Sequence, residues 1–194
     1  MELTQNPSVL ELVRKTAELT TPKEIVWIDG SEAQLESLRK IAVETGELIK
    51  LNEEKLPGCY LNRSDVNDVA RVEGRTFICS RTREEAGPTN NWMDPDEMKA
   101  KLHEILRCAM AGRTMYVIPY SMGVIGSPFA KYGIEVTDSI YVVLNMAIMT
   151  RIGTKVLDAL GDSSDVILGV HSKVTLDPEN RYIVHFPEEN KIIS

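Results

Sequence analysis

Side chains that commonly bind metals or carry nucleophilic chemistry are scarce in this sequence. Its 194 residues include three histidines, at His103, His171 and His185. The histidines are scattered, and no pattern places two of them together with a carboxylate. Neither a metal site nor a Ser-His-Asp arrangement is therefore indicated. We therefore expect each histidine to be an ordinary surface or core residue.

Cysteine is equally rare, with three residues at Cys59, Cys79 and Cys108. Their spacing matches no metal-binding pattern, and an odd number argues against a disulfide framework. We expect buried thiols in a protein that occupies a reducing compartment. The N-terminus also lacks the basic and then apolar segment that directs export, so we expect a cytoplasmic protein.

Excess positive charge is also missing. The 22 Lys and Arg residues are outnumbered by 29 Asp and Glu residues, which gives a net charge of −7. This balance argues against non-specific nucleic-acid binding, which depends on clustered basic side chains. The apolar segment from Ser139 to Ile152 is about 14 residues long, too short to cross a bilayer. We therefore expect neither nucleic acid nor a membrane as a partner.

What the sequence does contain is typical of one soluble globular domain. Hydrophobic residues make up 43% of the chain and charged residues 26%. A domain of this length can bury about 70% of its unfolded surface, which is enough for a single core.

The stretch from Thr114 to Gly153 is the expected centre of that core. Its uncharged, β-rich start predicts the central strand of a sheet, containing Met115–Ile118. Glycines and a proline then mark turns. The almost wholly apolar end predicts a helix that is buried on all sides. In order, we expect strand Met115–Tyr120, turns at Ser121–Gly123 and Gly126–Pro128, strand Ile134–Val136, an N-cap at Thr137 or Asp138, helix Ser139–Ile152, and a C-cap at Gly153.

Strand and helix patterns alternate through the rest of the chain. A strand, a helix and a second strand near the N-terminus suggest a βαβ unit, which predicts a single α/β domain with a mixed sheet flanked by helices. The expected elements are a helix after Asn6 with Val9, Leu12, Val13 and Ala17 on its apolar stripe, strand Ile25–Ile28, a helix after Ser31 with Leu35, Leu38, Ile41 and Ala42 that stops at Gly46, strand Leu48–Leu51, a short helix capped by Ser64 and Asp65 that ends near Arg71, strand Thr76–Ser80, a helix from Asp94 to Gly112, a helix at Lys155–Leu160, and strands Val166–Val170 and Tyr182–Phe186.

Two features could be mistaken for ligand sites. The glycine loop, Ser121–Ser127, lacks the Gly-Lys-Ser/Thr ending and the following helix of a phosphate-binding loop, so a structural turn is the favoured interpretation. Five arginines fall within about twenty residues, and for four of them we expect solvated positions on loops. The five are Arg63, Arg71, Arg75, Arg81 and Arg83.

Several long motifs resemble one family of enzymes. They are RTMYVIPYSMGVIGSPFAKYGIEVTDS, NDVARVEGRTFICS, AGPTNNWMDP and RYIVHFPEENKIIS. Together they resemble consecutive pieces of the N-terminal region of the GTP-dependent phosphoenolpyruvate carboxykinases. Two departures concern Val124 and Ile140, where the family usually has proline, and the connection at His171–Thr175 is shorter than usual.

The resemblance carries expectations about function. Arg71 stands where the family's DVAR arginine contacts the anionic substrate, and a planar guanidinium suits two carboxylate or phosphate oxygens. The whole enzyme interconverts oxaloacetate and phosphoenolpyruvate with GTP and Mn²⁺ or Mg²⁺. Its nucleotide- and metal-binding parts correspond to sequence beyond Ser194. We therefore expect a substrate-contributing domain that binds no cofactor, binds substrate weakly, and is inactive without the C-terminal part.

A second hypothesis stays open: a free-standing relative that binds a small anion or a protein partner without chemistry. Reading the gene past Ser194 separates the two, because a glycine-rich continuation with a Gly-Lys-Ser/Thr loop favours the enzyme and a stop codon favours the relative. Under the enzyme hypothesis, we also expect an exposed patch and self-association near the C-terminal strand and the Arg71 edge.

Overall fold

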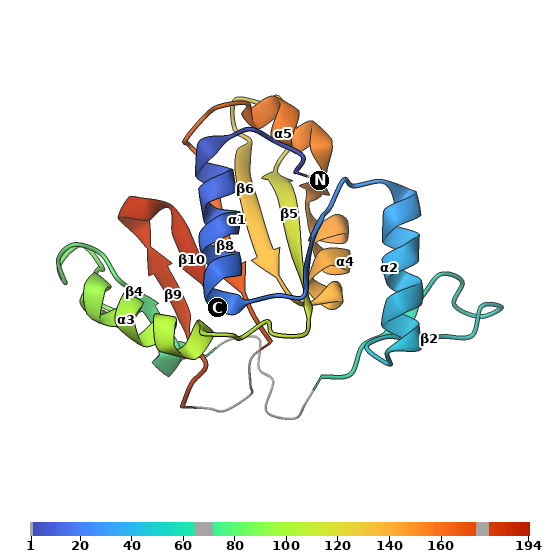
Figure 1. Cartoon of the computed structure of the whole chain (residues 1–194), viewed down its shortest axis with the longest axis horizontal. Coiled ribbons are helices and arrows are strands. Elements are labelled where there is room, and N and C mark those ends of the chain that lie inside the picture. The colour runs from blue at the N-terminus through green and yellow to red at the C-terminus, as the bar shows by residue number, and fades with distance from the viewer. Residues whose placement is uncertain (1, 65–71, 174–178) are drawn as a thin grey trace.

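The computed structural model describes residues 2–64, 72–173 and 179–194 (Figure 1). Within these residues, one mixed sheet contains eight strands. Their order is β1 (Glu24–Trp27), β5 (Thr114–Met122), β6 (Lys131–Thr137), β8 (Ile167–His171), β10 (Lys191–Ile193), β9 (Ile183–Phe186) and β4 (Thr76–Ile78), with β7 (Arg151–Ile152) also paired to β5. Neighbours are antiparallel at β5–β6, β5–β7 and β10–β9 and parallel elsewhere. The prediction of an α/β domain with a mixed sheet is confirmed.

Helices lie on both faces of this sheet. α1 (Pro7–Thr20) and α3 (Pro95–Leu106) cover one face and share a core with β5, β6, β8 and β9. α2 (Glu32–Glu44) and α4 (Ile140–Met149) pack over β5 on the opposite face, beside the right-hand end of the sheet in Figure 1. α5 (Thr154–Leu160) adds its buried leucines to the first core. None of the described helices combines the length and apolarity needed to cross a membrane.

The N-terminal helix forms as its sequence predicts. The Asn6 side chain accepts a hydrogen bond from the Val9 N–H at 3.2 Å, and Pro7 occupies the first turn, where its missing N–H costs nothing. The same Asn6 amide donates to the carbonyls of Gly161 and Ser163 at 2.7 and 2.9 Å. One buried cap therefore also ties α1 to the turn that follows α5.

The predicted βαβ unit is wrong. Ile49–Lys50 forms β2, which pairs with β3 (Tyr60–Leu61) in a separate two-stranded sheet instead of joining β1. Both residues of β2 are exposed, including the apolar Ile49, so the strand buries neither face against the main sheet. The predicted stripe of α2 is also too wide, because Ile41 is 43% exposed.

The apolar helix after Asp138 is shorter than predicted. Ser139 is its N-cap, in place of Thr137 or Asp138, and it ends at Met149. The prediction that it is buried on all sides is wrong, because Ile148 is 83% exposed. After the C-cap Thr150, Arg151–Ile152 forms β7 instead of continuing the helix, because β5 is longer than β1. β1 pairs with β5 only at positions 114–117, so the later edge of β5 is free to pair with β7 at 120–121. Gly153 accordingly precedes α5 rather than capping α4.

Other predictions need smaller corrections. β5 is an interior strand, but β8 occupies the middle of the sheet order. α3 ends at Leu106 and the chain continues to Gly112 through turns, and strand β10 was not predicted. Cys59 and Cys108 are exposed, while Cys79 is buried. The most exposed large apolar side chains among the described residues lie in the β5–β6 connection and at the end of α4, away from the C-terminal strand: Phe129, Ile148, Val124 and Met149.

Two glycines allow the β1–α2 and β7–α5 connections to touch. Gly30 and Gly153 both have positive φ angles, +80° and +103°. A Cβ on Gly153 would lie 2.2 Å from the Asp29 carbonyl oxygen, and one on Gly30 would lie 2.5 Å from the Ile152 oxygen. The contact is backbone against backbone, so no side chain can move aside to relieve it.

Gly153→Ala should therefore lower the free energy of unfolding by about 3 kcal/mol or more, because it combines an unfavourable φ with a backbone clash. Gly112→Ala is the matched control, since its φ is +75° and nothing lies within 4 Å of the added Cβ. The control should lose only about 1–2 kcal/mol. Urea unfolding measures both, and equal losses would contradict the proposed close approach.

Candidate functional site

The carboxyl ends of three parallel strands meet at one edge of the sheet. β6, β8 and β10 run in the same direction and end at Thr137, His171 and Ile193. In open α/β sheets, ligands bind outside the carboxyl ends of the strands. The residues that follow these strands are therefore the candidates for a ligand site.

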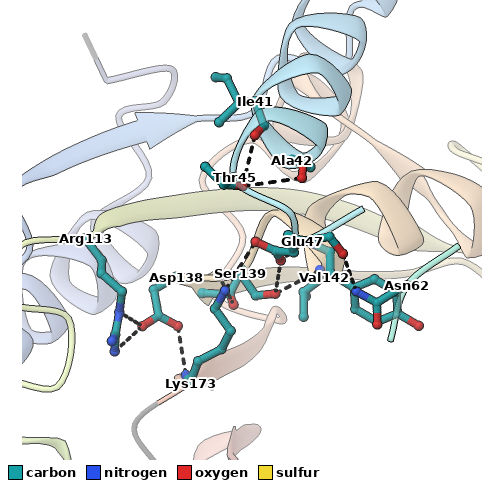
Figure 2. A network of polar contacts seen from close by, with 12 residues as sticks. Ile41, Ala42, Thr45, Glu47, Asn62, Arg113, Asp138, Ser139, Val142 and Lys173 are labelled. Carbon is teal, nitrogen blue, oxygen red and sulfur yellow. Dashed lines mark hydrogen bonds and ion pairs between the residues drawn. The ribbon is translucent and has the colours of Figure 1, made fainter. Parts of the chain in front are cut away.

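Asp138, directly after β6, is a buried carboxylate whose oxygens are fully engaged (Figure 2). Its Oδ2 accepts from Arg113 Nε at 2.7 Å and from Ser172 Oγ at 3.2 Å, and Arg113 Nη2 lies 2.7 Å from the same oxygen. Its Oδ1 accepts from the Lys173 N–H at 2.9 Å. The carboxylate thus fixes the chain just after β8 and holds Arg113 from the connection before β5.

Glu47 forms a second junction beside Asp138 (Figure 2). Its Oε1 accepts from Ser139 Oγ at 3.3 Å and from the Tyr141 N–H at 2.9 Å, at the N-terminus of α4, where a negative charge is favourable. Its Oε2 accepts from Lys173 Nζ at 3.3 Å, and its backbone oxygen accepts from Asn62 Nδ2 at 2.8 Å. Asn62 and Lys173 stand shortly before positions 65 and 174. The described chain is therefore anchored at Glu47 just before each of these positions.

The chain that resumes at Val72 is also firmly held. The short helix η1 (Glu73–Arg75) leads into β4, and the Asn91 amide donates to the Glu73 and Thr76 carbonyls at 2.8 and 3.1 Å. Arg75 Nη1 donates to the Tyr182 hydroxyl at 2.8 Å, and Arg75 Nη2 forms an ion pair with Glu179. Arg75 is therefore a structural residue, and the prediction that it is a solvated loop charge is wrong.

The remaining arginines divide into two groups. Arg63, Arg81 and Arg83 are exposed, as predicted. Arg71, the predicted substrate-binding residue, and the predicted helix that ends near it lie outside the described residues, as does part of the connection predicted to be short after His171. At the described part of this edge, Arg113, Lys173 and Arg75 already have carboxylate partners. These three residues therefore stabilise this edge through ion pairs, and their positive charges are already balanced by carboxylates.

Neither a large pocket nor a cluster of metal ligands is found among the described residues at this edge. A pocket of about 70 Å³ lies beside the ends of β8 and β10, lined by Ser172, Ser194, Asn180, Arg181 and apolar side chains. Ligand pockets usually measure about 300–1,000 Å³, so it cannot enclose a substrate. Among the described residues, no three or more His, Cys, Asp or Glu side chains gather closely enough to hold a metal ion.

The glycine loop and the histidines behave as predicted. The loop joins antiparallel β5 and β6, and the Gly126 N–H donates to the Tyr132 hydroxyl at 2.9 Å, which makes it a structural turn. His103 is exposed on α3. His171 Nδ1 lies 2.8 Å from Thr137 Oγ1, inside the sheet.

Sequence reasoning missed one charged residue in the sheet. Glu135, in the middle of β6, is mostly covered, and no described residue donates a hydrogen bond or forms an ion pair with its carboxylate. Burial raises the pKa of this carboxyl to about 8. Burial and then the nearby Glu135 charge raise the pKa of the Tyr120 hydroxyl to about 12. An acidic residue between the apolar strand residues Ile134 and Val136 was the available signal.

Comparisons with known proteins identify the family of this chain. The family model described as phosphoenolpyruvate carboxykinase N-terminal domain matches residues 11–194. The chain belongs to this family. The predicted resemblance is thereby confirmed, and these residues correspond to the N-terminal portion of a GTP-dependent carboxykinase.

Three relatives, each named phosphoenolpyruvate carboxykinase (GTP), illustrate the similarity. The chain is 52% identical over 191 residues to the protein of Anaeromyxobacter dehalogenans strain 2CP-C, which covers 98% of this chain and 32% of that relative. It is 49% identical over 201 residues to the protein of Neocallimastix frontalis, covering 97% of this chain and 33% of the relative. For Corynebacterium jeikeium the values are 46%, 202 residues, 98% and 33%. The chain thus spans about a third of the length of these carboxykinases.

Asp138→Ala should lower the free energy of unfolding by about 3 kcal/mol, because it leaves Arg113 and the Lys173 N–H without their buried acceptor. Asp138→Asn should lose less, since its amide oxygen can still accept one hydrogen bond. The control is Asp165→Ala, which removes a 3.7 Å ion pair between Asp165 and Lys131. The Lys131 side chain is 65% exposed and the Asp165 side chain 75%. That variant should lose at most about 0.5 kcal/mol in the same urea titration. Similar losses for Asp138→Ala and Asp165→Ala would contradict the role of Asp138.

Glu135 should make stability depend on pH. The pKa of its carboxyl is raised in the folded chain from an ordinary 4.5 to about 8, so its contribution to stability is complete below pH 4.5 and is lost as pH rises to 8. Glu135→Gln removes this titration. Relative to the variant, the natural chain should lose roughly 2 kcal/mol between pH 5 and pH 8, allowing for partial hydration. The exposed Glu44→Gln variant is the control, and a pH-independent difference for Glu135→Gln would refute the prediction.

Proposed function

We propose that this chain is the N-terminal, substrate-contributing domain of a GTP-dependent phosphoenolpyruvate carboxykinase, which converts oxaloacetate and GTP to phosphoenolpyruvate, GDP and CO₂. The observation that carries the proposal is the continuous match of residues 11–194 to the family, at about half identity to proteins that bear this name. A match along the whole domain is far more specific than any single motif.

In this proposal, Arg71 binds the anionic groups of the substrate. Its guanidinium would offer a planar pair of donors to a carboxylate or phosphate, orienting the substrate and balancing its negative charge. The described residues support such a role indirectly. Glu47 and Asn62 anchor the chain before position 65, and η1 is held after position 71 through Asn91.

The remaining two thirds of the enzyme would supply the nucleotide and metal sites. The described residues hold no suitable cluster of metal ligands, so we assign Mn²⁺ or Mg²⁺ and GTP to that part. When bound, the divalent ion would supply positive charge beside phosphate oxygens. The role left to this domain is to bind and orient the substrate.

The free-standing anion-binding relative is the less favoured function. The relatives that match along the whole of this chain are named as carboxykinases and are about three times as long. Nothing in the described geometry favours a separate anion site, because Arg113, Lys173 and Arg75 are already paired with carboxylates.

A carboxykinase-length chimera tests the assignment of Arg71. It would join residues 1–194 to the part of the A. dehalogenans relative that lies outside the match. Arg71→Ala should lower kcat/KM for oxaloacetate ten- to a hundredfold or more, and Arg71→Lys should recover only part of the loss, because a single ammonium cannot reproduce the fork. Arg83→Ala, at an exposed loop position, is the control and should leave kcat/KM unchanged. Unchanged kinetics in Arg71→Ala would remove Arg71 from the site.

The 194-residue chain alone should be inactive. One charge-assisted contact is worth about 1.5–3 kcal/mol, while association costs at least about 4 kcal/mol, so phosphoenolpyruvate should bind at millimolar strength or weaker. Isothermal titration calorimetry measures the binding, and a coupled assay with GTP and Mn²⁺ measures turnover. Micromolar binding or measurable turnover would overturn the assignment of a dependent domain.

A further inference from the structure

The two faces of the sheet are covered to different extents. On the face under α1 and α3, a continuous core reaches from β5 to β9 and includes Val136, Val170, Val184 and Phe186. On the opposite face, the described core cluster contains residues only from the first 152 positions, packed around β5, α2 and α4. In Figure 1, α2 and α4 accordingly lie beside β5, on the far side of the sheet order from β9 and β4.

One row of paired residues shows where this second cover stops. Directly paired residues share a face of the sheet, and here the row crosses six strands. It consists of Ile118, Glu135, Gly169, Ile192, His185 and Ile78. Ile118 is fully buried beneath α4, whereas Ile192, His185 and Ile78 are only half-buried. Among the described residues, the helical cover of this face therefore ends at Glu135.

We define the open half-face as the part of this row beyond Ile118 together with its neighbours on the same side. It comprises Glu135, Gly169, Ile192, His185, Ile78, Ile167, His171, Ile183 and Thr76. Four isoleucines on four strands give it breadth and apolar character. It contains no Lys or Arg, and every position follows from the pairing registers of the described strands.

The Glu135 carboxylate lies at the margin of the open half-face. A Cβ on Gly169 would fall 1.8 Å from Glu135 Oε2, so the side chain reaches across β8 over this glycine. It therefore points away from α4 and toward Ile192. No described residue donates a hydrogen bond to it. A mostly covered carboxylate without a donor is costly, and it marks a position that a partner can improve.

We propose that the open half-face is an interface with the remaining two thirds of the carboxykinase, and that this part places a Lys or Arg side chain on Glu135. The proposal rests on the proposed function. The partner's apolar side chains pack on the isoleucines, and its cation forms a charge-assisted hydrogen bond with the carboxylate. The length of the relatives outside the match supplies the occupant, since this chain spans only 32% of the A. dehalogenans protein.

A second copy of this chain fits the open half-face poorly. Two identical faces packed about a twofold axis would bring two Glu135 carboxylates toward one interface, and neither face has a Lys or Arg to pair with them. Uncompensated buried charge costs several kcal/mol per ion. Charge complementarity therefore favours a partner with different chemistry.

Photo-crosslinking in the carboxykinase-length chimera tests the interface. p-Benzoylphenylalanine would replace His185 on the open half-face and, as the control, Glu44 on α2, which is exposed and lies at the opposite end of the sheet order, near β5. Mass spectrometry identifies the crosslinked peptides. We expect crosslinks from position 185 to residues after 194 of the same polypeptide, near a Lys or Arg, and none from position 44.

A charge swap tests the assigned partner of Glu135. Glu135→Lys should weaken crosslinking from position 185 at least tenfold, and changing the identified Lys or Arg to Glu should restore it, which a general folding defect would not allow. Crosslinks between two copies, crosslinks only from position 44, or a crosslinked region without a basic residue would each overturn the proposal. Turnover is measured separately. Crosslinking without turnover would support the interface and contradict the proposed function. Turnover without crosslinks from position 185 would support the proposed function and contradict the interface.

Discussion

The length of β5 is the constraint on which the rest of the structure depends. Its nine residues pair with β6 along one edge and with β1 and then β7 along the other. Because β1 covers only the first part, β7 can occupy the rest, and this ends α4 at Met149 and starts α5 after Gly153. The contact between Gly30 and Gly153 then follows, because these glycines lie in the connections that leave β1 and β7. The pairing with β6 in turn sets Asp138 at the edge where β8 and β10 also end.

The sequence predicted local structure well where one residue decides it. Asn6, Ser31 and Asp94 each cap the helix expected of them, because a cap depends only on the next few residues. Pairing between distant strands was harder. Nothing near Ile49 reveals that β2 pairs with β3 instead of β1, and nothing near Ile152 reveals the free edge of β5. Arg75 was misjudged for the same reason, since its partners Glu179 and Tyr182 lie about a hundred residues away.

Two acidic residues three positions apart, Glu135 and Asp138, meet opposite conditions. Asp138 accepts from Arg113, Ser172 and the Lys173 N–H, so its charge is balanced within the domain. Glu135 has no described donor, and burial raises the pKa of its carboxyl to about 8. A balanced buried charge fixes local geometry, whereas an unbalanced one weakens the isolated domain as pH rises. The first residue is therefore explained by this chain alone, and the second by a chemical group that the described residues do not provide.

The division between the two faces of the sheet gives the domain two separable properties. The core under α1 and α3 runs from β5 to β9, so the sheet can form before any partner is present. In the part of the chain that the structure describes, the opposite face is covered only as far as Ile118, and half-buried isoleucines lie beyond Glu135. Apolar area supplies most of the favourable free energy of an association, while a single charge selects the partner and its alignment. Glu135 and Gly169 lie only two residues before the paired strand ends Thr137 and His171. A partner aligned by Glu135 would therefore approach the same edge at which Asp138 and Glu47 anchor the chain.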